Sequence, residues 1–141
     1  ARPLGQRLAW SLRAHIGAGR VAQSVVVPVP MPLIRRWKRG IDHAGMLAQE
    51  VARVCDATYY RALWRRGSVA QAGASRTARH RATARGWHVH LRARSRLQGR
   101  DVVLVDDVLT TGRTARIAGG LLREAGARSV TLGVIAVADS T

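Results

Sequence analysis

The sequence has 141 residues, the length of a single domain, and its 47% apolar content excludes a disordered chain. The formal net charge is +16, which attracts nucleic acid or polyphosphate ligands, although an arginine-biased genome would also give it without function. The single cysteine, Cys55, excludes an internal disulfide and a cysteine zinc site. No apolar run is long enough for a membrane span, and no signal peptide is visible. We therefore expect a cytoplasmic protein without membrane insertion.

The first half of the chain predicts two helices and two strands. Residues 1–20 have leucines every four positions, which predicts an amphipathic helix that Gly17 and Gly19 end. The β-branched run at residues 25–29 predicts a strand that prolines end. A second helix is expected around residues 44–52, and a second strand around residues 59–64.

The second half begins with a stretch without periodicity. Residues 65–86 are rich in arginine and are expected to form a mobile basic loop. Alternation at residues 87–91 predicts a strand on which His88 and His90 share one face, which is too few ligands for a metal site. The remaining expected elements are a strand at residues 101–105, a helix from Ile117 to Ala125 capped by Gly126, and a strand at residues 130–137.

This order of elements predicts the fold class. Strands that are apolar on both faces and alternate with helices indicate an α/β fold, with a mainly parallel twisted sheet flanked by helices. The whole chain, residues 1–141, is expected to form one domain. Ligands of such sheets bind beyond the carboxyl ends of the strands. This rule singles out the turn after Val29 and the turn after Val105 as candidate sites.

The residues after Val105 have the composition of a phosphate and diol site. Asp106 and Asp107 would stand at the sheet edge, where adjacent carboxylates suit a diol or a hydrated Mg²⁺. The loop that follows leads into a helix whose N-terminal amides favour a phosphate. It consists of Thr110, Thr111, Gly112, Arg113 and Thr114. Taken singly, these features would be only a helix cap and solubilising acids, but together they favour phosphoribosyl binding.

The stretch from Val102 to Thr114 resembles the 5-phosphoribosyl diphosphate signature of type I phosphoribosyltransferases. The resemblance implies that Asp106 and Asp107 bind the ribose hydroxyls, with Mg²⁺ on one of them. It also implies that residues 110–114 hold the 5-phosphate. Arg113 departs from the family, which usually has a small residue there.

A second resemblance covers most of the chain from Val25 onward. The Val-Pro-Val-Pro run leading to Arg39 and Gly40, together with the paired aspartates, resembles the ComF/GntX family of competence-associated, phosphoribosyltransferase-like proteins. Ile41, Asp42 and His43 depart from it, because the family usually has an aromatic residue, Asn and Gln there. The N-terminal zinc ribbon that many members have is absent from this sequence.

The resemblance implies displacement at the anomeric carbon of phosphoribosyl diphosphate, with diphosphate as the leaving group. Arg39, Arg79 and Arg81, with Mg²⁺, would neutralise the leaving group, and the basic loop would close over the site. If catalytic, the protein would be a pentosyltransferase acting in nucleotide metabolism. A domain that only senses the ligand remains an alternative, and the sequence identifies no acceptor.

The rival hypothesis is a competence or DNA-uptake factor that binds single-stranded DNA on the same fold. The net charge agrees with it, and Trp37, Trp64 and Trp87 lie near arginines, although Trp64 and Trp87 occupy positions more typical of a core. Partners under this hypothesis include other competence proteins. Pairing of two copies of the chain as a homodimer is left open.

Overall fold

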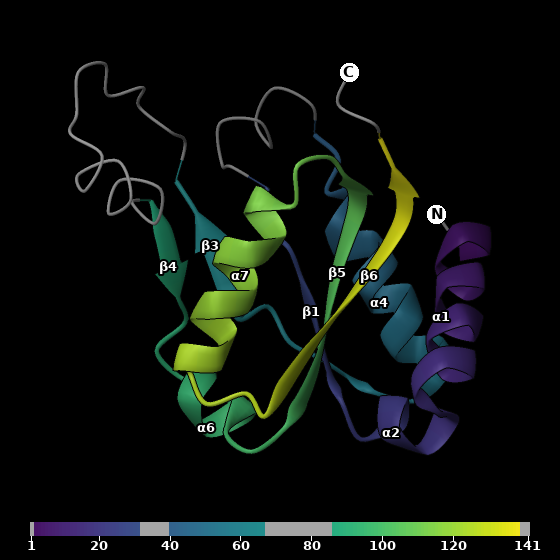
Figure 1. Ribbon diagram of the computed structural model, residues 1–141, viewed down its shortest axis with the longest axis horizontal. Helices are drawn as coiled ribbons and strands as arrows, with labels where there is room; N and C mark the ends of the chain where they lie inside the picture. Colours follow the sequence, from purple (N-terminus) through teal and green to yellow (C-terminus); the bar gives the residue numbers. More distant parts are fainter. Residues whose placement is uncertain (1, 32–39, 67–85, 139–141) are drawn as a thin grey trace.

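The computed structural model of the protein describes residues 2–31, 40–66 and 86–138 (Figure 1). Its helices are α1 (Arg2–Ile16), α2 (Ala18–Ala22), α4 (His43–Cys55), α6 (Ala93–Leu97) and α7 (Arg113–Glu124). Its strands are β1 (Val25–Pro28), β2 (Thr58–Tyr59), β3 (Leu63–Arg65), β4 (Trp87–Val89), β5 (Asp101–Leu109) and β6 (Ser129–Val137).

A parallel sheet forms the centre of the molecule. Its strand order is β2-β1-β5-β6, and every neighbouring pair runs parallel. Strands β3 and β4 pair antiparallel in a separate two-stranded sheet. Helices α1, α2 and α4 lie on one side of the main sheet, while α6, α7 and the β3–β4 pair lie on the other (Figure 1). The predicted α/β architecture with a mainly parallel sheet is confirmed.

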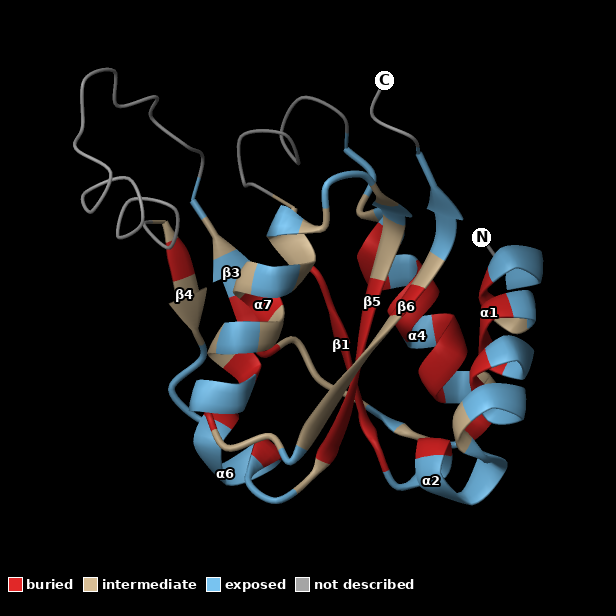
Figure 2. Ribbon diagram, viewed as in Figure 1, coloured by how far each residue is buried: buried red, intermediate tan, exposed pale blue. Residues whose placement is uncertain are grey.

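The alternation of side chains along the strands builds two separate cores. Val25 and Val27 of β1 pack in the cluster under α6, α7 and the β3–β4 pair, whereas Val26 packs in the cluster under α1 and α4. Strand β5 alternates in the same way, with Leu104 on one side and Val103 on the other. Strands β1 and β5 are therefore buried on both faces (Figure 2), as expected for parallel strands between helices.

Several elements differ from the sequence-based expectations. The strand expected at residues 59–64 is two short strands in different sheets, because residues 60–62 cross from β2, beside β1, to the β3–β4 pair. Gly17, with φ of 91°, ends α1 as predicted, but Gly19 lies inside α2. Strand β5 does not end at Val105 but continues to Leu109, since β6 extends the ladder with Asp106 opposite Val134 and Leu109 opposite Val137.

Other expectations about single residues had mixed outcomes. Trp87 is a core residue, as predicted, with 7% of its surface exposed, and Cys55 also lies in the core with 6% exposed. Trp64 is not, because 37% of it is exposed. Arg65, assigned to the mobile loop, belongs to β3 and is paired with Trp87. Residues 67–85 of that expected loop lie outside the described part of the chain.

The approach of α1 to α4 requires a glycine, which gives a stability prediction. A Cβ on Gly5 would lie 2.6 Å from both Cβ and Cγ of Glu50. Gly5→Ala must therefore separate the two helices, and we expect it to lower the free energy of unfolding by roughly 1–3 kcal/mol in urea titrations. The matched control is Gly120→Ala in α7, where a Cβ would meet nothing within 4 Å. The control should be neutral or stabilising by up to about 1 kcal/mol. Equal stability of the two variants would contradict the packing argument.

Within residues 2–31, 40–66 and 86–138, no helix combines the length and the apolar character that crossing a bilayer demands.

Candidate functional site

A cavity of about 550 Å³ opens where β1 and β5 end. This is the edge of the sheet singled out by the turns after Val29 and Val105. Its lining comes from the residues that follow β1, from the start of α4 and the residues just before it, from β3, and from the end of β5 through the start of α7. The lining residues are Val29, Pro30, Met31, Ile41, Asp42, His43, Ala44, Arg65, Asp106, Asp107, Val108, Thr110 and Thr114.

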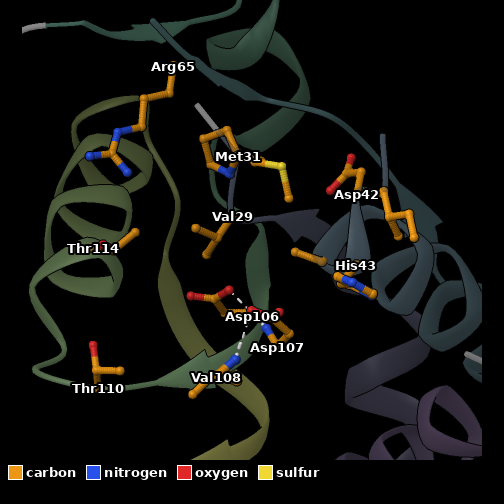
Figure 3. Close-up of a pocket in the computed structure, with 13 residues that line it drawn as sticks. Val29, Met31, Asp42, His43, Arg65, Asp106, Asp107, Val108, Thr110 and Thr114 are labelled. Atoms are coloured by element: carbon orange, nitrogen blue, oxygen red, sulfur yellow. Dashed lines mark hydrogen bonds between the residues drawn. The ribbon is translucent and has the colours of Figure 1, made fainter. Parts of the chain in front are cut away.

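The two predicted aspartates form the centre of this cavity (Figure 3). Because β5 continues to Leu109, Asp106 and Asp107 stand on the strand itself rather than in a loop. Each side chain accepts a hydrogen bond from the backbone amide of the next residue. Oδ1 of Asp106 accepts a hydrogen bond from the Asp107 amide at 2.9 Å, and Oδ1 of Asp107 accepts one from the Val108 amide at 2.9 Å. The strand therefore fixes two neighbouring carboxylates in the cavity, each with an oxygen that these bonds do not use.

The environment of Asp106 disfavours its charge. The pKa of Asp106 is raised to about 7, chiefly by burial and in part by a hydrogen bond to the Asp107 side chain and the charge of that neighbour, whereas the hydrogen bond from the Asp107 amide opposes the rise. A carboxyl group that is costly to ionise gains most from a bound cation or from donating hydroxyl groups.

The predicted phosphate loop divides into two kinds of residue. Thr110 and Thr114 line the cavity, on the side of the aspartates away from Asp42 and His43 (Figure 3). Thr111 and Arg113 do not line it. Oγ1 of Thr111 accepts a hydrogen bond from the Arg113 amide at 3.3 Å, so Thr111 shapes the turn.

Gly112 makes this turn possible. It has φ of 77°, a left-handed conformation that favours glycine, and it is the N-cap residue of α7. The N-terminal end of α7, with the positive end of its dipole, is therefore brought to the cavity wall beside Thr114.

Three polar lining residues were not predicted as site residues. Arg65 reaches the cavity from β3, and its guanidinium lies 4.9 Å from the centre of the Trp87 ring. Asp42 caps α4, accepting a hydrogen bond from the Gly45 amide at 3.0 Å and pairing with Arg61 at 2.7 Å. His43 follows it in the first turn of α4, and its imidazole makes no hydrogen bond to another described residue. The only signal in the sequence was that Asp42 and His43 replace the usual Asn and Gln.

The other predicted site residues cannot be placed. Arg39, Arg79 and Arg81, expected to neutralise a leaving diphosphate, lie outside the described residues. Within residues 2–31, 40–66 and 86–138, no three His, Cys, Asp or Glu side chains gather as a metal site. The paired aspartates still fit Mg²⁺, which is typically held by one or two carboxylates together with substrate phosphates and water.

Comparison with known proteins bears on the fold of the chain. The model of the phosphoribosyl transferase domain family matches residues 6–140. A solved glutamine phosphoribosylpyrophosphate amidotransferase from B. subtilis is similar in structure, with a TM-score of 0.65 and 25% sequence identity. That match covers 95% of this chain and 25% of the amidotransferase. The predicted type I phosphoribosyltransferase fold is confirmed.

Two curated relatives confirm the second predicted resemblance. Competence protein F of Haemophilus influenzae is 30% identical over 107 residues, which cover 74% of this chain and 46% of that protein. The DNA utilization protein YhgH of Escherichia coli is 36% identical over 121 residues, which cover 82% of this chain and 51% of the relative. The chain thus spans about half the length of these relatives.

Proposed function

Since this chain belongs to the phosphoribosyl transferase domain family, we propose that its cavity binds 5-phosphoribosyl diphosphate together with Mg²⁺. The supporting observation is that one cavity brings these groups together. Two carboxylates lie at its centre, and two threonines and a helix N-terminus lie at one side. A phosphorylated pentose needs such a combination, because it presents a diol and a phosphate on one small ring. The amidotransferase that is similar in structure has the same ligand in its name.

The proposal assigns a role to each residue. The hydroxyls of Thr110 and Thr114 and the first amides of α7 bind the 5-phosphate. Asp106 and Asp107 accept hydrogen bonds from the ribose hydroxyls. Mg²⁺, held by one of these carboxylates and by the ligand, would neutralise charge on the diphosphate. Arg65 adds a cation to the wall of the cavity.

The same geometry is compatible with two uses of the bound ligand. In one, the protein transfers the phosphoribosyl group to an acceptor: the bond from the anomeric carbon to the diphosphate breaks, and a bond to the acceptor forms. In the other, the protein senses the ligand without chemistry. For transfer, we propose Arg39, Arg79 and Arg81 as the groups that stabilise the departing diphosphate. Both uses require the binding step, which is therefore the step to test.

Protection against thermal unfolding tests the phosphate loop. Phosphoribosyl diphosphate with Mg²⁺ should raise the melting temperature of the wild-type protein by about 5 °C or more at roughly 100 times Kd. Thr114→Val removes one hydroxyl contact to a charged phosphate and should weaken binding at least about 10-fold, measured as a smaller shift at equal ligand. Thr58→Val, on β2 and outside the cavity, is the control and should keep the full shift. Equal shifts in both variants would show that the Thr114 hydroxyl does not contribute to binding of the ligand.

A second candidate function is the handling of DNA. Two relatives have names that refer to competence and to DNA utilization. A specific observation in this chain favours the same role, because aromatic rings and arginines gather on and beside the β3–β4 pair. We propose this function beside ligand binding and not in place of it, since none of these rings lines the cavity.

A further inference from the structure

Four rings lie together on and beside the β3–β4 pair. Trp64 and His88 are cross-strand partners whose rings stack, with centroids 4.0 Å apart and planes 14° from parallel. Tyr60 and His90 meet edge to face at 6.0 Å, and Tyr60 Oη lies 3.1 Å from His90 Nδ1. We call these four residues the ring surface.

The strands direct Trp64 and His88 away from the core, whereas Tyr60 packs partly against it. Along β3 and β4 successive side chains alternate between faces. Leu63 and Trp87 point inward and are 1% and 7% exposed. Their neighbours Trp64 and His88 therefore point outward, and 37% of Trp64 stays exposed although His88 stacks on it. A partly exposed tryptophan presents a large flat ring that a partner can stack on.

The charge around the ring surface is uniformly positive. Arg92, Arg94 and Arg96 are exposed on and before α6, and the Arg96 guanidinium lies 5.8 Å from the centre of the Tyr60 ring. The sequence has no acidic residue between Asp56 and Asp101. Arginine beside flat rings matches a polymer of stacked bases joined by phosphates.

We propose that the ring surface binds single-stranded DNA, and this inference rests on the DNA-handling function proposed above. Bases stack on the ring faces of Trp64 and His88 that these two residues do not cover for each other, while the arginines of α6 contact the phosphates. A single strand is required, because the bases of a duplex are already stacked and hide their faces. Such contacts read no base sequence, so the binding is sequence-tolerant and weakens steeply with salt.

Fluorescence anisotropy with a labelled oligothymidylate at low ionic strength tests the proposal. Trp64→Ala should weaken binding roughly 10-fold, the loss typical of one stacked base, and His88→Ala should weaken it in the same direction. The matched control is Trp10→Ala, because Trp10 on α1 is 61% exposed and lies outside the ring surface. Arg96→Gln should weaken binding and flatten its salt dependence more than Arg7→Gln, which removes an exposed arginine of α1. Circular dichroism of each variant checks that it is folded.

The other outcomes separate this inference from the proposals on which it depends. Equal affinities of folded Trp64→Ala and Trp10→Ala would overturn the ring surface while leaving the DNA-handling function in place. A wild-type protein that binds no oligothymidylate would overturn both, without affecting the proposal for the cavity. Tighter binding of duplex DNA, or of an oligouridylate RNA, would overturn the assignment to single-stranded DNA.

Discussion

Replacing Asp106 by asparagine is expected to weaken the binding of phosphoribosyl diphosphate with Mg²⁺ roughly 100-fold or more. The carboxylate lies in the centre of the cavity, where it would accept hydrogen bonds from the ribose hydroxyls. Hydrogen bonds to a charged group contribute about 1.5–3 kcal/mol each, and two of them account for the expected loss. Asp107→Asn should act in the same direction. Titration calorimetry of each variant measures the effect.

The same substitution should stabilise the protein without ligand at high pH. The pKa of Asp106 is raised to about 7 in the folded protein, whereas an unfolded aspartate titrates near about 3.9. The stability that comes from the protonated carboxyl is fully present below about pH 4 and is lost as the pH rises through about 7. Because asparagine does not ionise, Asp106→Asn does not lose this stability as the pH rises. We expect it to gain about 1 kcal/mol over the wild type at pH 8, a modest figure because the group is partly solvated.

The control for both effects is Asp56→Asn. Asp56 is exposed, has a left-handed backbone with φ of 55°, and lies outside the cavity, so asparagine suits its conformation. This variant should bind the ligand as the wild type does. If Asp106→Asn bound equally well, the proposed role of the carboxylate pair would be wrong.

The second large effect is expected at the opposite end of β5. Asp101 is 8% exposed and pairs with Arg128, whose Nη2 donates a hydrogen bond of 2.7 Å. It also accepts hydrogen bonds from Ser129 at 2.5 Å and from Arg20 at 3.2 Å. This one carboxylate ties the start of β6 and helix α2 to β5. Asp101→Asn should lower the free energy of unfolding by about 2 kcal/mol, because the amide carries no charge for the two arginines and keeps only one of the two acceptor oxygens.

The pH dependence of stability checks the same group independently. Hydrogen bonds from Arg128, Ser129 and Arg20 hold the pKa of Asp101 well below its usual range. A lowered pKa in the folded state gives stability that is present above the unfolded value of about 3.9 and is lost as the pH falls through the folded value.

The difference between wild type and Asp101→Asn in urea titrations should therefore shrink as the pH falls below about 4. Glu124→Gln, on the exposed end of α7, is the control and should differ little from wild type at any pH. A difference that stays constant down to low pH would contradict the account of Asp101.

Much of the fold could be predicted because the hydrophobic pattern of its longer elements is unambiguous. The valines of β1 and β5 are apolar on both faces, which only a sheet covered on both sides explains. The short elements could not be predicted in the same way. Residues 58–65 form two strands of two and three residues, and their separation depends on partners distant in sequence, β1 for one and β4 for the other. Local propensity does not contain that information.

The residues of the candidate site also differ in whether the sequence alone predicts their position. Asp106, Asp107, Thr110 and Thr114 follow one another along a strand and into a helix, so sequence order alone placed them together. Arg65 and His43 reach the cavity from elements whose position depends on tertiary packing. The exposure of Trp64 was also missed, because a tryptophan on a strand is usually buried and only the pairing with His88 shows which face it occupies.

Titration of the wild-type protein with phosphoribosyl diphosphate in a calorimeter, with and without Mg²⁺, tests the central claim most directly. The cavity geometry predicts saturable binding of one ligand per chain that depends on Mg²⁺, since the adjacent carboxylates repel the charged ligand unless a cation lies between them. Absence of saturable heat at millimolar ligand in the presence of Mg²⁺ would contradict the claim.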